Sequence, residues 1–60
     1  MKTSELLKIL KQYGCYFIKH SGNHDIWYSP ITKHKFPVPR HASEVKKGTV
    51  EAILKQAGIK

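Results

Sequence analysis

The sequence has few acidic residues, one cysteine and no long apolar run. The single cysteine, Cys15, excludes a disulfide within the chain and fits a reducing compartment. No apolar stretch approaches the roughly 20 residues that a membrane-spanning helix needs. The first residues also lack the apolar segment of a signal peptide. These absences predict a soluble cytoplasmic protein, and 60 residues predict a single domain over residues 1–60.

Charge of one sign dominates. Eleven Lys and Arg stand against four Asp and Glu, which gives a formal net charge of +7 at pH 7. Such a balance favours polyanionic partners, with nucleic acid first and an acidic protein second. The alternative is a basic but merely solvated surface.

Both ends of the chain show the spacing of a helix with one apolar face. The apolar residues are Leu6, Ile9, Leu10 and Tyr13 near the start, and Val50, Ile53, Leu54 and Ala57 near the end. We interpret both stripes as core. Thr3 is the expected N-cap of the first helix, and the second is expected to begin near residues 48–49. Gly14 and Gly58 stand where left-handed residues commonly end helices.

The middle of the chain favours strands. The expected strands are residues 15–20, 24–29 and 35–38, with a turn at 21–23 and another at 30–34. Pro37 cannot donate to a sheet ladder, so its strand is expected either to lie at an edge or to be interrupted there. Residues 39–47 are expected to form a loop, with a short helical turn from Ser43. The order α-β-β-β-α predicts an α+β fold, with a three-stranded antiparallel sheet and two helices on one of its faces.

The four histidines do not form a zinc pattern. They are His20, His24, His34 and His41. Structural zinc sites draw on four ligands, often in closely spaced pairs, and here only the first two histidines could meet, across a hairpin. Cys15 opens an apolar strand and is interpreted as core. We predict neither a metal site nor a cofactor.

Acid–base chemistry by a histidine remains, because an imidazole titrates near neutral pH. RNA carries its own nucleophile, the 2′-hydroxyl, and a base that removes its proton needs only cations to stabilise the phosphoryl oxygens. Gly22 would let the backbone approach the substrate closely. The expected RNA-binding cations are Lys19, Lys33, Lys35, Arg40, Lys46 and Lys47. The alternative is that His24 is an ordinary turn residue beside a solvated lysine face.

Strand alternation divides residues 24–29 into two sets. His24, Ile26 and Tyr28 share one face, and Asp25, Trp27 and Ser29 share the other. The sequence leaves open which of the two faces is buried. Aromatic side chains here can stack on bases, but in so small a chain strand aromatics are expected mostly in the core. The aromatic residues in question are Tyr16, Trp27 and Tyr28.

Four motifs spread over nearly the whole chain carry a resemblance. They are Leu6-Leu7-x-x-Leu10 with Gly14; Gly22-Asn23-His24; Pro39-x-His41; and Lys47-Gly48-Thr49-x-x-x-Ile53-Leu54-Lys55-Gln56-Ala57-Gly58. In these motifs the chain resembles the HicA family, small toxins of bacterial toxin–antitoxin pairs that are described as mRNA interferases. The last motif is long and fairly specific.

The resemblance implies a fold like the double-stranded-RNA-binding domain and a catalytic role for His24. It implies a metal-independent endoribonuclease that acts on single-stranded RNA (mRNA), with His41 as a helper or RNA contact. It also implies a HicB-like antitoxin that blocks the toxin, so we expect a monomer when free and a hetero-oligomer with the antitoxin. Asn23 departs from the family, which usually has Ser there. The alternatives are a noncatalytic RNA-binding module and a protein-interaction domain.

Overall fold

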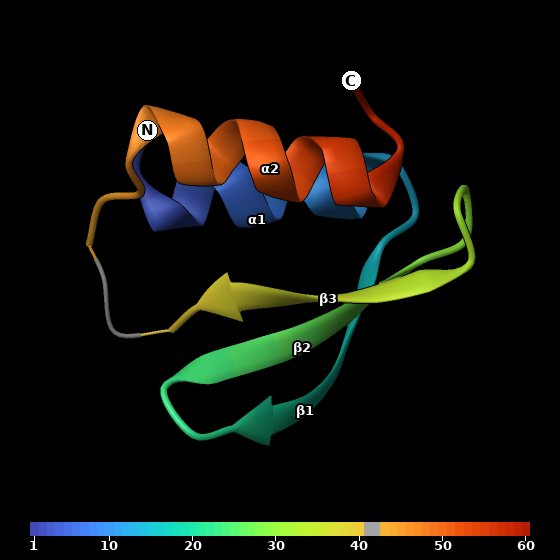
Figure 1. Cartoon of the computed structure of the whole chain (residues 1–60), viewed down its shortest axis with the longest axis horizontal. Helices are drawn as coiled ribbons and strands as arrows, with labels where there is room; N and C mark the ends of the chain where they lie inside the picture. Colours follow the sequence, from blue (N-terminus) through green and yellow to red (C-terminus); the bar gives the residue numbers. More distant parts are fainter. Residues whose placement is uncertain (41–42) are drawn as a thin grey trace.

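The computed structural model describes residues 1–40 and 43–60. Its elements are α1 (Thr3–Gln12), β1 (Tyr16–Ser21), β2 (His24–Ser29), β3 (His34–Pro39) and α2 (Lys47–Ala57). The strands form one antiparallel sheet in the order β1-β2-β3. Figure 1 shows both helices on the same side of this sheet. The predicted α+β fold is confirmed, and its α-β-β-β-α order is that of the double-stranded-RNA-binding-domain-like fold.

The two helices end in the same way, at Gly14 and Gly58. Both glycines have positive φ angles, +86° and +78°, which residues with a Cβ rarely adopt. Each glycine N–H donates to the carbonyl three residues back, and the next N–H donates to the carbonyl five residues back. These N···O distances are 3.0 and 2.9 Å at Gly14, and 3.1 and 3.0 Å at Gly58. The predicted left-handed helix ends are confirmed.

The helix starts differ from the prediction. Thr3 is not an N-cap, because α1 begins at Thr3 and Lys2 takes the capping position without a side-chain cap bond. The reason is a pairing with the segment before α2. The Thr3 N–H donates to the Ser43 carbonyl at 3.2 Å, and Lys2 forms an isolated antiparallel bridge with Glu44. The helical turn predicted from Ser43 is therefore wrong, since this backbone is extended. α2 begins at Lys47, one to two residues earlier than expected.

The strands follow the predicted order with small shifts in their limits. β1 begins one residue later than expected, and β3 extends one residue further at each end. The edge position predicted for Pro37 is confirmed, since β3 is the last strand of the sheet. β1 is the other edge, and it carries a bulge between Phe17 and Lys19. None of the described helices is long and apolar enough to cross a membrane.

The core lies between the helices and one face of the sheet. Its buried residues are Leu6, Leu10, Cys15, Trp27, Phe36, Val38, Val45, Val50, Ile53 and Ala57. The predicted core role of Cys15 is confirmed. Tyr13 was expected in the α1 stripe, but it is 50% exposed because it stands past the last helical turn as the C-cap.

The alternation along β2 is confirmed, and the structure decides which set faces the helices. Trp27 and Ser29 are buried against the helix layer, so Asp25 shares that side. His24 and Ile26 consequently point away from the helices, together with Tyr28. The catalytic candidate thus stands on the face that the helices leave uncovered.

Candidate functional site

The face of the sheet away from the helices is called the open face here. Residues directly opposite in an antiparallel pair project to the same side of the sheet. The residues that pair with His24, Ile26 and Tyr28 therefore lie on the open face with them. The open face consists of Tyr16, Lys19 and Ser21 from β1, His24, Ile26 and Tyr28 from β2, and Lys35, Pro37 and Pro39 from β3. All nine are exposed or half-buried. None carries a carboxylate, so the formal charge of this face comes from Lys19 and Lys35.

His24 is the first residue of β2 and lies between two neighbours of the sheet. It pairs with Ser21 on β1 and Pro39 on β3. Its side chain is exposed, and no described residue forms a hydrogen bond with its imidazole. The preceding turn closes at Gly22, whose φ is +58°. An imidazole held by the backbone and free at both ring nitrogens can take a proton from a bound substrate.

Arg40 holds the turn that carries His24. Its backbone N–H donates to the Asn23 carbonyl at 3.2 Å, and its Nη2 donates to the Gly22 carbonyl at 2.8 Å. The Nε atom lies 4.0 Å from Oδ1 of Asp25. Arg40 is half-buried and its guanidinium contacts the hairpin, and its predicted contact with RNA stays a prediction. A contact between residues 18 apart in the chain has no local sequence signal.

His20 and His24 lie on opposite faces of the sheet. His20 pairs with Asp25, and its imidazole donates from Nδ1 to the Asp25 carboxylate at 2.6 Å on the helix side. The approach of the two histidines that a zinc site would need is therefore absent. Within residues 1–40 and 43–60, no group of three or more potential ligands could hold a metal ion. His34 pairs with Ser29 at the far end of β2, and His41 lies outside the described residues.

Apart from Arg40, the predicted RNA-binding cations are spread over three places. Lys19 and Lys35 share the open face with His24. Lys33 lies in the turn between β2 and β3, at the other end of the sheet, with a φ of +59°. The remaining pair, Lys46 and Lys47, stands at the start of α2 in the helix layer. Figure 1 shows that α2 begins at the end of the molecule where the β1–β2 hairpin lies.

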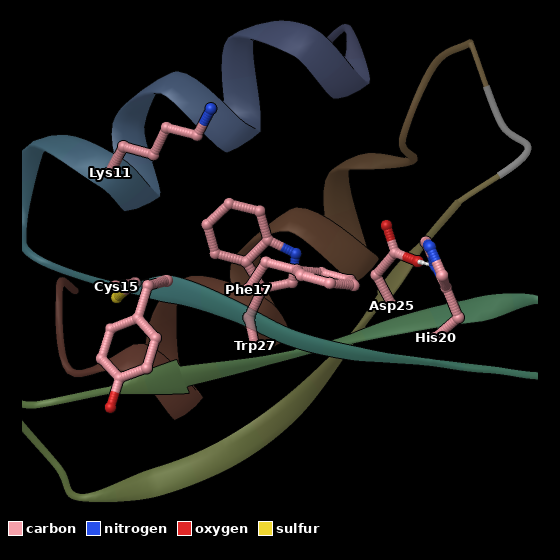
Figure 2. A pocket seen from close by; sticks show the side chains of 7 residues that line it. Lys11, Cys15, Phe17, His20, Asp25 and Trp27 are labelled. Carbon is pink, nitrogen blue, oxygen red and sulfur yellow. Dashed lines mark hydrogen bonds and ion pairs between the residues drawn. The ribbon is translucent and has the colours of Figure 1, made fainter.

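A separate apolar groove lies beside β1, on the helix side. It has a volume of about 340 Å³ and is lined by Lys11, Cys15, Tyr16, Phe17, His20, Asp25 and Trp27. Figure 2 shows the Trp27 indole above β1, Lys11 reaching over it from α1, and the His20–Asp25 pair at the other end. The sequence reading missed this groove. The sequence feature that could have indicated the groove is Phe17, an aromatic residue of β1 whose side chain is exposed at the edge of the sheet. The groove holds neither His24 nor the two open-face lysines.

The fold and the open face together define a class of protein. A three-stranded sheet, backed by two helices and carrying a histidine and lysines on its bare face, is a double-stranded-RNA-binding-domain-like α+β domain with a basic surface. The family model described as the HicA toxin of bacterial toxin–antitoxin pairs matches residues 3–59. The chain belongs to this family, as its motifs predicted. No curated protein and no solved structure matched it. Family membership makes it the toxin of a pair whose other member is a cognate antitoxin.

Proposed function

We propose that this toxin is a metal-independent endoribonuclease that cuts single-stranded RNA with His24 as the general base. One observation carries the proposal: exposed His24 shares a face with Lys19 and Lys35, and that face has no carboxylate. A polyanion on this surface would meet cations on both sides of β2. The nearest acidic residue along the strand, Asp25, projects to the opposite side and is bound to His20.

The proposed reaction follows from the chemistry of an imidazole beside a ribose phosphate. Neutral His24 removes the proton from the 2′-hydroxyl, and the 2′-oxygen attacks the adjacent phosphorus. The bond from phosphorus to the 5′-oxygen then breaks, and that oxygen takes a proton from the imidazolium or from water. Lys19, which lies opposite Ile26 and therefore two residues along the sheet from His24, stabilises the charge on the phosphoryl oxygens, and Lys35 holds a phosphate further along the strand. The products are a 2′,3′-cyclic phosphate and a 5′-hydroxyl.

The hairpin supports this role by fixing the position of His24. Gly22 gives the positive φ that closes the turn, and the Asn23 carbonyl is tied to the Arg40 backbone. Asn23 replaces the serine usual in the family, and its backbone contact does not depend on the side chain. We therefore propose that the turn keeps its geometry with Asn23. Arg40 acts as a brace of the hairpin more than as an RNA contact.

The proposal extends to inhibition. A HicB-like antitoxin that covers the open face would bury His24 and keep RNA away from the lysines. A net charge of +7 favours an acidic surface on that partner. The free toxin would then be a cytoplasmic monomer and the inhibited form a hetero-oligomer. Lys33, Lys46 and Lys47 lie off the open face and are available to such a partner or to a longer RNA.

A second candidate is a noncatalytic RNA-binding module on the same fold. It is favoured by one observation: among the described histidines, only His24 lies on the open face, so no second imidazole stands beside it as an acid. The two candidates differ in whether the RNA chain is broken or merely bound.

End-labelled single-stranded RNA distinguishes them on a denaturing gel. The proteins to compare are wild type, His24→Ala and His34→Ala, since His34 is also an exposed strand histidine but lies at the far end of the sheet. We expect wild type and His34→Ala to cut the RNA, and His24→Ala to lose about 10²–10⁴ in rate. Intact RNA with wild type, together with retardation on a native gel, would establish the binding module. Equal cutting by His24→Ala would remove His24 from the mechanism.

A further inference from the structure

Two tyrosines form an exposed aromatic pair on the open face. Tyr16 of β1 and Tyr28 of β2 are directly opposite in the sheet. Their ring centroids lie 5.4 Å apart, with an angle of 44° between the ring planes. Tyr16 is 53% exposed and Tyr28 is half-buried. The pair therefore presents ring surface to solvent on a face that no described helix covers.

The surroundings of the pair suit a single strand of nucleic acid. Lys35 lies on β3 opposite Tyr28. Lys19 is the next open-face residue of β1 after Tyr16 and lies opposite Ile26. Sequence-tolerant binding of single strands combines aromatic side chains that stack on bases with cations that contact phosphates. Sheet aromatics stack bases in this way in other RNA-binding domains. Lysines without a carboxylate would suit either RNA or an acidic protein surface. The exposed aromatic pair beside them favours RNA, because an acidic protein surface would need only the charge.

The distance from His24 fixes which part of the substrate reaches the pair. Tyr28 is four residues along β2 from His24, which corresponds to about 13 Å at the usual rise of a strand. The nucleotide whose 2′-hydroxyl meets His24 cannot also place its base on Tyr28. The stacked base belongs to a neighbouring nucleotide on the same strand.

We propose that Tyr16 and Tyr28 form a base-stacking subsite that holds an unpaired base of the RNA a short distance from the scissile phosphate. This inference rests on the proposed function and deepens it. It assigns the aromatic pair to base contact, and Lys35, which lies opposite Tyr28, to the phosphate beside it. The subsite requires unpaired bases, because a base inside a duplex offers no free ring surface to a flat sheet. It thus gives a physical reason for single-stranded substrates.

The test compares a short labelled oligouridine RNA with an abasic ribose-phosphate strand of the same length. Binding is measured by fluorescence anisotropy with His24→Ala protein, which prevents cleavage. The key variant adds Tyr16→Leu and Tyr28→Leu, and its ring-preserving partner adds Tyr16→Phe and Tyr28→Phe. Tyr13→Leu is the matched control, because Tyr13 is 50% exposed but lies at the end of α1. Circular dichroism checks that each variant is folded.

We expect the leucine variant to bind the oligouridine roughly 5- to 150-fold more weakly, with unchanged affinity for the abasic strand. The phenylalanine variant and Tyr13→Leu should keep the preference for the strand with bases. An unchanged preference in the folded leucine variant would overturn the stacking subsite and leave the pair to a protein contact. If the leucine variant does not fold, loss of the preference in single Tyr16→Leu supports the inference and its retention overturns it. No binding of either strand by His24→Ala would overturn the proposed RNA function itself.

Discussion

The two faces of β2 show how one strand serves two purposes. Trp27 is 3% exposed and Ser29 is fully buried, both against the helix layer. Tyr28, which lies between them, and His24 at the start of the strand stand on the open face and have solvent access. Six consecutive residues thus divide alternately between stability and the proposed chemistry. In a chain of 60 residues this division leaves the packing of the core to the helix side of the sheet, so the open-face side chains can contact a ligand.

The division has a consequence for mutations. A change on the helix side should lower the free energy of unfolding, whereas a change on the open face should alter RNA binding or cleavage and leave the fold intact. Pairs of variants with one member on each face therefore test whether the two faces differ in this way.

The largest effect on stability is expected for Trp27→Ala. Removing a buried tryptophan typically costs about 3–5 kcal/mol. This is comparable with the whole stability of roughly 3–9 kcal/mol expected for a chain of this length. Tyr28→Ala, on the adjacent position but the open face, should cost about 1 kcal/mol or less. Urea denaturation followed by circular dichroism measures both. Equal losses of stability would show that Tyr28 on the open face contributes as much to the fold as the buried Trp27.

A smaller loss is expected for Ser29→Ala. The Ser29 hydroxyl is buried, donates to the Ala57 carbonyl at 2.6 Å, and accepts from the Ile31 N–H at 3.2 Å. It ties the end of β2 to the end of α2. Its removal leaves a buried carbonyl without its donor, which costs about 1–3 kcal/mol. Ser21→Ala is the matched control on the open face and should change the free energy of unfolding by at most about 0.5 kcal/mol. A harmless Ser29→Ala would mean that the bond adds nothing to the docking of α2.

The smallest effect concerns the salt dependence of RNA binding. In the His24→Ala background, Lys19→Ala with Lys35→Ala should reduce the slope of log affinity against log salt by about 0.7 per lysine. Lys8→Ala with Lys55→Ala removes the same charge from exposed helix positions. That control should leave the slope nearly unchanged. If both pairs flatten it equally, RNA is attracted by net charge and the open face has no special role.

The order of elements could be predicted because each signal is local. Apolar spacing indicated both helices, Gly14 and Gly58 indicated their ends, and the strand-forming runs indicated the sheet. The buried face of β2 could not be predicted, because each alternating set contains one aromatic residue, Tyr28 or Trp27. Packing against the helices made the choice, since the larger Trp27 side chain fills the space beneath them.

The candidate site was predicted less completely than the fold. The Gly-x-His motif indicated His24. The charge of the sequence could not indicate which cations lie on the same face as His24. Lys33 and Lys35 are two residues apart, yet one lies in a turn at the far end and the other on the open face. The bracing role of Arg40 depends on a contact across the sheet that no short motif records. Tyr16 and Tyr28 were expected in the core with Trp27, but their pairing places both on the open face.

The central claim is that the open face cleaves RNA with the 2′-hydroxyl as nucleophile and without a metal ion. The most direct measurement is cleavage of labelled single-stranded RNA by the purified toxin in EDTA, with analysis of the new ends. We predict that cleavage continues and yields a 2′,3′-cyclic phosphate and a 5′-hydroxyl, while RNA with a 2′-deoxy nucleotide at the cut position stays intact. Cleavage that stops in EDTA and returns with added Mg²⁺ or Zn²⁺, or that leaves a 5′-phosphate, would contradict the account.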